Sequence, residues 1–280
     1  MTTWFITGAS RGFGALIAEL ALAKGDNVVA TARNPEAIEK RIGPHPNLLA
    51  VALDVTNEEQ AKAAAAKAVE RFGQIDVLLN NAGFGLLGAV EEATQAEIEA
   101  VYRTNVFGLL AVTRAVLPHM RARRAGRILN VSSIGGYRAG AGFGVYCSTK
   151  FAVEGLSEAL HAELAPLGIH VTVVEPGYFR TDFLDSTSLS VSSSSIADYS
   201  ETAGKVRNVA MDLNHGQPGD PAKLAEVLVE FVTAPNPPVR LPLGSDTVAA
   251  IETKHASDAE IIAKWRPVSV STDYSAPASA

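Results

Sequence analysis

The stretch TGASRGFG, residues 7–14, carries glycines at positions 8, 12 and 14 and follows the short apolar segment TWFIT, residues 3–7. A short run of β-branched and aromatic residues is typical of a buried parallel strand. Apolar residues with helical spacing follow from Phe13 to Lys24, and Gly25 ends that pattern. A glycine-rich turn between a strand and a helix lets the backbone approach a pyrophosphate, which the free N–H groups of the helix N-terminus bind. A glycine-rich turn without a ligand is the alternative.

Strand-like and helix-like segments alternate along most of the chain, outward from this turn. Further strands are predicted at residues 27–32, 48–55, 75–81, 126–133, 169–176 and 239–244. Helices are predicted at residues 57–72, 95–123, 144–167, 221–233 and 246–265. This alternation implies parallel strands joined by right-handed crossovers. The predicted fold class is therefore α/β, a Rossmann-type doubly wound parallel sheet of about seven strands, with its ligand crevice at the carboxyl ends of the strands.

The regular alternation stops after the sixth strand. The segment DSTSLSVSSSSIADYS, residues 185–200, is rich in serine, has no clear period and is long for a connection. A disordered insertion and a mobile lid are both compatible with it, and its place directly after the sixth strand favours a lid. We expect one domain over residues 1–280, with a substrate lid at residues 183–219 and a loose tail at residues 266–280.

Composition excludes several classes of function. The net charge is −6, and the basic run RARR, residues 121–124, lies where a helix should end, so no nucleic-acid partner is predicted. The N-terminus has no secretory pattern and no apolar stretch is long enough to span a membrane, so a cytoplasmic protein without a membrane partner is expected. The single cysteine, Cys147, excludes an intrachain disulfide and is expected to be a buried neutral thiol. The six histidines show no metal-ligand spacing, so no metal site is predicted.

The end of the second strand indicates which dinucleotide the crevice takes. NAD-binding sheets carry an acidic residue there, which binds the ribose 2′-hydroxyl. This chain has ATAR, with Ala32 at the expected position of the acid and Arg33 after it, and Arg11 lies in the glycine-rich turn. Two guanidinium groups suit a 2′-phosphate. The predicted cofactor is NADP(H), although two ordinary surface arginines remain the alternative.

A tyrosine and a lysine four residues apart, Tyr146 and Lys150, follow a strand that ends in Ser132 and Ser133. Residues i and i+4 share one face of a helix, so both side chains can project into one site. At about 4 Å and an effective dielectric constant of about 20, the ammonium stabilises a phenolate by roughly 4 kcal/mol, or about three pKa units. Tyr146 is therefore a candidate general acid or base. Ser133 could hydrogen-bond a substrate oxygen as charge develops on it.

Together these motifs resemble the short-chain dehydrogenase/reductase family over residues 3–181, in its single-domain, NADP(H)-preferring form. TGASRGFG resembles the family's cofactor turn, LDV its adenine contact, NNAG its fourth-strand signature and PGYFRT the segment along the nicotinamide. The catalytic residues that the resemblance implies are Asn105, Ser133, Tyr146 and Lys150. The cofactor-binding residues that it implies are Gly8, Ser10, Arg11, Gly12, Phe13, Gly14, Arg33, Asp54, Val55, Asn81, Ala82, Gly83, Tyr146, Lys150, Pro176, Gly177, Phe179 and Thr181.

The resemblance implies an NADPH-dependent carbonyl reductase or alcohol dehydrogenase. Tyr146 would exchange a proton with the substrate oxygen, Ser133 would orient the carbonyl, Lys150 would lower the pKa of the tyrosine and bind the ribose, and Asn105 would support a proton relay. Aromatic residues near the strand ends suggest a hydrophobic ketone, aldehyde or secondary alcohol. The resemblance also implies a homodimer or homotetramer, paired through the helices at residues 95–123 and 144–167. A non-catalytic NADP(H)-sensing regulator is the main alternative function.

Overall fold

A seven-stranded sheet lies at the centre of the computed structural model, which describes residues 1–274. The strands pair in the order β3-β2-β1-β4-β6-β7-β9, and every pairing is parallel. This confirms the predicted doubly wound fold. The strands of this sheet are β1 (Thr3–Thr7), β2 (Asn27–Ala32), β3 (Leu48–Ala52), β4 (Val77–Asn80), β6 (Gly126–Val131), β7 (Ile169–Pro176) and β9 (Arg240–Leu243).

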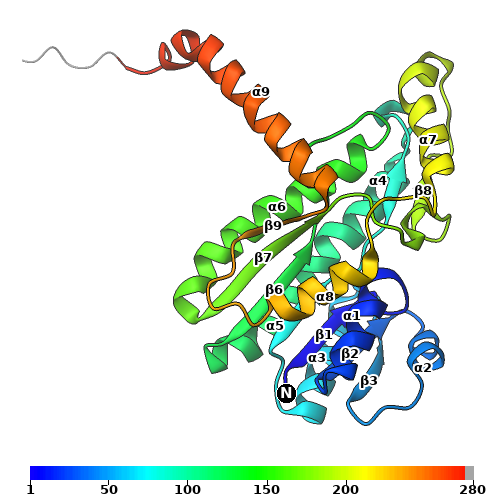
Figure 1. The fold of residues 1–280 in the computed structure, drawn as a ribbon, viewed down its shortest axis with the longest axis vertical. Coiled ribbons are helices and arrows are strands. Elements are labelled where there is room, and N and C mark those ends of the chain that lie inside the picture. The colour runs from blue at the N-terminus through cyan, green and yellow to red at the C-terminus, as the bar shows by residue number, and fades with distance from the viewer. Residues whose placement is uncertain (275–280) are drawn as a thin grey trace, which may run out of the picture.

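Helices cover both faces of the sheet (Figure 1). On one face pack α1 (Gly12–Ala23), α2 (Glu36–Ile42) and α8 (Pro221–Phe231). On the other face pack α3 (Glu58–Phe72), α5 (Leu109–Arg123) and α6 (Gly144–Leu164). In the described residues no helix is both long and apolar enough to cross a membrane.

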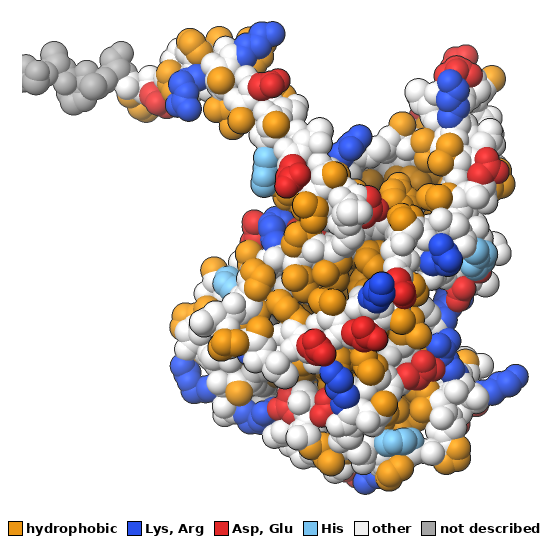
Figure 2. Space-filling model, in the orientation of Figure 1, with side chains coloured by type: hydrophobic (Ala, Val, Ile, Leu, Met, Phe, Trp, Pro, Cys, Tyr) orange, Lys and Arg blue, Asp and Glu red, His pale blue; other side chains and the backbone are white. Residues whose placement is uncertain are grey.

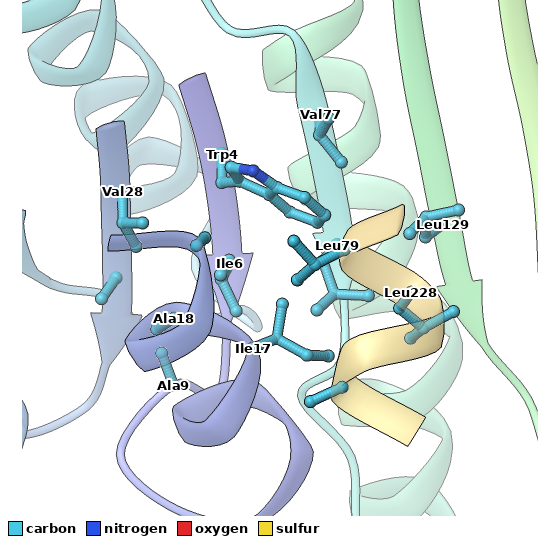
Figure 3. Packing of buried hydrophobic residues seen from close by; sticks show 14 of the residues in the cluster. Trp4, Ile6, Ala9, Ile17, Ala18, Val28, Val77, Leu79, Leu129 and Leu228 are labelled. Carbon is cyan, nitrogen blue, oxygen red and sulfur yellow. The ribbon is translucent and has the colours of Figure 1, made fainter. Parts of the chain in front are cut away.

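The two faces have separate hydrophobic cores because successive residues of a strand point to opposite sides. In β1, Trp4 and Ile6 pack with Ile17 of α1 and Leu228 of α8 (Figure 3). Phe5, between them, belongs to the core on the other face. The interiors of both cores are closed to solvent, which makes the sheet a rigid platform for the residues at its edge.

The strand order reverses between β1 and β4, which are neighbours in the sheet. In an open α/β sheet this reversal leaves a crevice outside the carboxyl ends of the strands, because the connecting chains leave in opposite directions. The glycine-rich turn follows β1, the NNAG motif begins at the end of β4, and the Ser133–Lys150 region follows β6. The fold thus brings together motifs that lie far apart in the sequence.

The predicted helix at residues 95–123 is divided into three consecutive parts. Residues Gln95–Tyr102 form α4 and Leu109–Arg123 form α5, and Arg103–Gly108 between them form a wider π-helical turn. Such turns insert an extra residue into a helix and frequently occur at functional sites. Sequence periodicity does not reveal this insertion, since the buried stripe continues through it from Val101 to Val106.

The expected lid has more regular structure than its serine-rich sequence indicates. Within it, β8 (Leu189–Val191) pairs in parallel with β5 (Gly85–Leu87), and α7 (Lys205–Leu213) follows. The carboxylate of Glu92 ties the segment to the body: it accepts from the backbone N–H of Ile196 at 2.8 Å and bonds the Arg207 guanidinium. These contacts come from residues about a hundred positions apart, so local sequence could not predict them.

The first residues of the expected loose tail, from residue 266 to Val270, are helical. The last helix, α9 (Ser245–Val270), continues through Pro267 and projects away from the body (Figure 1). Its first turns contact the protein through the buried residues Thr247 and Ala250, and most of the remainder is exposed. The last part of the predicted tail, residues 275–280, lies outside the described residues.

Candidate active site

A cleft of about 810 Å³ opens at the carboxyl ends of the strands. Nearly all of the predicted site residues line it; only Gly14 and Asn105 lie behind its wall. Figure 2 shows hydrophobic side chains gathered in a hollow between α7 and α9. The apolar lining from the lid is contributed by Phe183, Leu184, Leu189 and Val206.

The glycine-rich turn adopts backbone conformations that favour glycine. Gly8 and Gly12 have φ of 65° and 55°, in the left-handed region that other residues rarely adopt. A Cβ atom on Gly12 would meet nothing within 4 Å, so the backbone there is open to a ligand. Gly14 is required for packing instead, because its Cβ would lie 2.5 Å from the carbonyl oxygen of Gly8.

Asn81, at the end of β4, holds the turn in place. Its side-chain nitrogen donates to the carbonyl oxygens of Thr7 and Gly8, each at 3.0 Å. The hydroxyl of Thr7 accepts in return from the backbone N–H groups of Asn81 and Ala82, at 2.9 and 3.0 Å. The first residue of the TGASRGFG motif therefore joins β1 to β4, a role that the sequence analysis did not assign to it.

The N-terminus of α1 is suited to an anion. Its N-cap residue, Arg11, makes no side-chain capping bond in the described part of the chain, and the first turn holds no acidic residue. The positive end of the helix dipole and the free N–H groups therefore face the cleft. Arg33 and Asp54 also line the cleft, but the Arg11 guanidinium donates to the carbonyl oxygen of Thr187 in the lid at 2.5 Å. The predicted convergence of Arg11 and Arg33 on a single anion thus remains a prediction.

Ser133 and Tyr146 lie side by side in the cleft wall. A Cβ atom on Gly135 would be 3.5 Å from the Ser133 hydroxyl and 3.6 Å from the Tyr146 ring, so this glycine leaves room for both. Burial raises the pKa of the Tyr146 phenol above its ordinary value, and hydrogen bonding by Ser133 opposes that rise. The tyrosine ring packs against Phe183 of the lid, with ring centroids 5.6 Å apart.

Lys150 lies one helical turn after Tyr146 on the same face of α6, and both are buried. Its ammonium donates to the carbonyl oxygen of Val131 at 2.9 Å and lies 5.7 Å from the centre of the Tyr146 ring. Burial lowers the pKa of Lys150 to about 8, although the negative charge of Glu154 acts in the opposite direction. That Lys150 lowers the pKa of the tyrosine remains a prediction.

Asn105 lies in the π-helical turn, behind the cleft wall, and is buried. Its side-chain nitrogen donates to the carbonyl oxygen of Phe84 at 2.9 Å and to the Thr149 hydroxyl at 3.1 Å. A Cβ atom on Gly83 would be 3.1 Å from the Asn105 side-chain oxygen and 3.7 Å from the Lys150 nitrogen. Gly83 therefore lets these two polar side chains approach each other from different helices.

The segment after β7 closes the far side of the cleft. Phe179 packs edge-on against Phe13 of the glycine-rich turn, with ring centroids 5.5 Å apart. The Thr181 hydroxyl accepts from the backbone N–H of Phe183 and so fixes the start of the lid. Gly177 is a glycine for a reason that the sequence did not indicate: a Cβ atom there would lie 2.2 Å from an oxygen of Asp246, at the start of α9.

Two further features complete the site. Cys147 is buried, as expected, and burial raises the pKa of its thiol; the residue also lines the cleft. Asp182, Asp185 and His215 come close enough together to share a metal ion, which their separation in the sequence concealed. Exposed acidic groups of this kind are common without an ion, and we assign no metal to them.

The chain matches the family model described as short chain dehydrogenase over residues 2–191. It is 39% identical to oxidoreductase BOA17 of Botryotinia fuckeliana over 275 residues, and this alignment covers 96% of this chain and 98% of that protein. It is also 39% identical over 240 residues to the 3-ketodihydrosphingosine reductase of Bacteroides thetaiotaomicron, and this alignment covers 85% of this chain and 86% of that protein.

Solved structures agree with these matches. A short-chain dehydrogenase from Streptomyces avermitilis superposes with a TM-score of 0.90 at 41% identity, over 98% of this chain and 100% of that one. A serine dehydrogenase complexed with NADP+ has a TM-score of 0.72 at 28% identity, over 86% and 94% of the two chains. A 3-ketoacyl-(acyl-carrier-protein) reductase from Brucella melitensis complexed with NADH has a TM-score of 0.71 at 29% identity, over 86% and 96%. The chain therefore belongs to the short-chain dehydrogenase family of oxidoreductases.

Proposed function

We propose that this protein is an NADPH-dependent reductase of hydrophobic ketones or aldehydes, which also oxidises the corresponding secondary alcohols. The observation that carries the proposal is the arrangement of Ser133, Tyr146 and Lys150 in one wall of the cleft, beside the glycine-rich turn. A protein that only senses the dinucleotide has no need for a buried tyrosine and a buried lysine at this position.

The hydride that reduces the carbonyl carbon comes from bound NADPH. The Ser133 hydroxyl orients the carbonyl oxygen and stabilises the charge that grows on it as the C=O π bond breaks. Tyr146 gives its proton to that oxygen, which completes the alcohol. Lys150 stabilises the resulting phenolate, and Asn105 supports the relay that returns a proton to it.

The residues of the glycine-rich turn are suited to the pyrophosphate of a dinucleotide, and Arg33 after β2 favours NADPH over NADH. The open backbone at Gly12 and the uncapped N-terminus of α1 provide N–H donors for a pyrophosphate. Arg33 lines the cleft after β2, where NAD-binding sheets carry an acidic residue. Its guanidinium can form charge-assisted bonds with a 2′-phosphate. The remaining predicted cofactor residues line the same cleft apart from Gly14, which supports it from behind.

The proposed substrate is hydrophobic because the cleft wall around Tyr146 is aromatic and aliphatic. Phe143 and Phe183 flank the tyrosine ring, at centroid distances of 6.1 and 5.6 Å. Leu189 and Val206 extend the apolar wall into the lid. The Bacteroides relative is named as a reductase of 3-ketodihydrosphingosine, so a ketone with a long aliphatic chain belongs among the test compounds.

Three organisational proposals accompany this function. We propose that residues 1–280 form one catalytic domain and that residues 183–219 serve as its substrate lid. We also propose a homodimer or homotetramer formed through the helices at residues 95–123 and 144–167. Phe107 and Phe151, 60% and 44% exposed on these segments, support that interface, since large exposed aromatic side chains favour burial against a partner.

The decisive experiment measures NADPH oxidation with a panel of ketones and aldehydes, from small aliphatic compounds to aryl, steroid and long-chain ketones, for the wild type, Tyr146→Phe and Tyr102→Phe. Loss of the proton donor should reduce kcat by about 10²- to 10⁴-fold, while the Kd for NADPH stays nearly unchanged. Tyr102→Phe is the matched control, because that hydroxyl donates to Ser148 and does not line the cleft. Undiminished turnover in Tyr146→Phe would exclude Tyr146 as the acid, and tight NADPH binding without any turnover would favour the sensing function.

A further inference from the structure

Gln217, in the last part of the proposed lid, has a buried carboxamide that takes no part in the proposed reaction. Only 1% of its surface is exposed, and it contributes to the lining of the cleft. Neither its side-chain nitrogen nor its side-chain oxygen has a hydrogen-bond partner among the described residues. No other buried amide side chain in residues 1–274 lacks a partner at both atoms. A buried amide without partners is costly, so the position calls for an explanation.

The backbone around Gln217 holds the side chain at a fixed place in the cleft wall. Its carbonyl oxygen accepts from the Arg180 guanidinium at 3.2 Å. Gly219, two residues later, donates to the carbonyl oxygen of Tyr178 and accepts from the backbone N–H of Arg180, both at 2.9 Å. The residues from 217 to 219 therefore run alongside the segment after β7, whose Phe179 packs against the glycine-rich turn.

The other amide in the cleft wall gives a direct comparison. Asn81 also lines the cleft, but its side-chain nitrogen donates to Thr7 and Gly8 and is fully used by the fold. The other lid residues that line the cleft are apolar or carry small hydroxyl groups. Gln217 thus differs from Asn81, because its carboxamide is buried in the cleft lining and neither of its polar atoms has a partner among the described residues.

A carboxamide offers two N–H donors and a carbonyl acceptor side by side. Its best complement is a ligand group that carries an acceptor and a donor at the same spacing, such as a second carboxamide. We propose that Gln217 is a binding residue of the cleft, whose carboxamide pairs with such a donor–acceptor group on a bound ligand. The nicotinamide carboxamide of the dinucleotide is one source of this group, and a substrate with a hydroxyl or amide close to its carbonyl is the other. The nicotinamide alternative depends on the proposal that the protein binds NADP(H).

The test compares Gln217→Leu with Gln95→Leu, an exposed glutamine on α4 whose side chain bonds only Glu99 within residues 1–274. Four quantities are measured: the Kd for NADPH, the Kd for 2′,5′-ADP, the Tm of the protein without ligand, and the KM for the ketone turned over fastest in the panel above. 2′,5′-ADP keeps the 2′-phosphate but lacks the nicotinamide, so it reports on the other half of the cleft. Binding and Tm need no turnover, which separates this proposal from the failure of the reductase assignment.

If the partner is the nicotinamide, Gln217→Leu should weaken NADPH binding by about tenfold to a hundredfold, the equivalent of one or two lost hydrogen bonds. The affinity for 2′,5′-ADP should not change, and the Tm without ligand should stay the same or rise. If the partner is on the substrate, NADPH binding should be unchanged and the KM should rise by a similar factor.

Two results would overturn the proposal. A lower Tm without ligand, with NADPH and 2′,5′-ADP weakened in parallel, would make Gln217 a structural residue of the lid. If Gln217→Leu changes neither the Kd for NADPH nor the KM, Gln217 is not a binding residue. The same conclusion holds if the Kd for NADPH is unchanged and no ketone is turned over.

Discussion

Gly14 provides the sharpest test of how the cofactor turn is built. The Gly14→Ala substitution adds one methyl group at a position where the ideal Cβ lies 2.5 Å from the Gly8 carbonyl oxygen and 2.6 Å from the Asn81 side-chain nitrogen. Both atoms belong to the hydrogen bond that fixes the turn to the end of β4. The methyl group therefore cannot be accommodated without moving the backbone at Gly8 or displacing Asn81.

Overpacking of a close contact costs about 1–3 kcal/mol. For a chain of this size, each kcal/mol corresponds to a Tm change of about 2–4 °C, so we expect Gly14→Ala to melt roughly 2–12 °C below the wild type. The same movement displaces the backbone N–H groups that face a bound pyrophosphate, so the Kd for NADPH should rise by about tenfold or more, as expected for the loss of even one charge-assisted bond. Thermal unfolding and fluorescence titration measure the two effects separately.

Gly155→Ala is the matched control, and its oligomeric state is measured alongside, because Gly155 lies one helical turn after Phe151 on a proposed interface helix. Gly155 is exposed on α6, and a Cβ atom there meets nothing within 4 Å. Alanine has the higher helix propensity, so this substitution should stabilise the protein by up to about 1 kcal/mol and leave NADPH binding unchanged. Wild-type Tm and wild-type NADPH affinity in Gly14→Ala would refute the packing argument for the turn.

Three further predictions address cofactor choice, catalysis and the lid. Arg33→Ala should weaken NADPH binding by about tenfold to a hundredfold and leave NADH binding almost unchanged, because only the 2′-phosphate is lost as a partner; equal effects on both would contradict the NADP(H) assignment. The kcat/KM for carbonyl reduction should fall as pH rises through about 8, where the Lys150 ammonium loses its proton, and a profile level across this range would exclude a charged Lys150 from the mechanism. Hydrogen bonds from the backbone N–H groups of Thr94 and Ser193 lower the pKa of Glu97 to about 2. The ionised Glu97 carboxylate therefore stabilises the folded protein fully above the ordinary pKa of glutamate, and this stabilisation is lost as the pH falls toward 2. Glu97→Gln should lower the Tm at neutral pH but not at pH 2.

The succession of strands and helices along the chain could be predicted from the sequence, because each element depends on local patterns. TWFIT and the other apolar runs are short and β-branched, which suits strands buried on both faces. Gly25 and Gly73 directly follow predicted helices, and Asn57 caps α3 by accepting from the N–H groups of Glu59 and Gln60, as a short polar side chain before a helical stretch does. The positions of Ser133, Tyr146 and Lys150 followed from their spacing around a strand end and along one helix face.

Tertiary contacts decided the rest, because these features depend on residues that are distant in the chain. The pairing of β5 with β8 brings together segments about a hundred residues apart, and β8 is only three residues long, so its brief alternation of apolar and polar residues is too short to indicate a strand. Gly177 is constrained by Asp246, and Asp182 and Asp185 meet His215, through connections that only the folded chain makes. The unpartnered amide of Gln217 is the clearest case: a glutamine in a loop is unremarkable in sequence, and only burial and the absence of a partner in the described structure give it significance. The propensity of a segment for helix or strand depends on neighbouring residues, whereas burial and hydrogen-bond satisfaction depend on the whole folded chain.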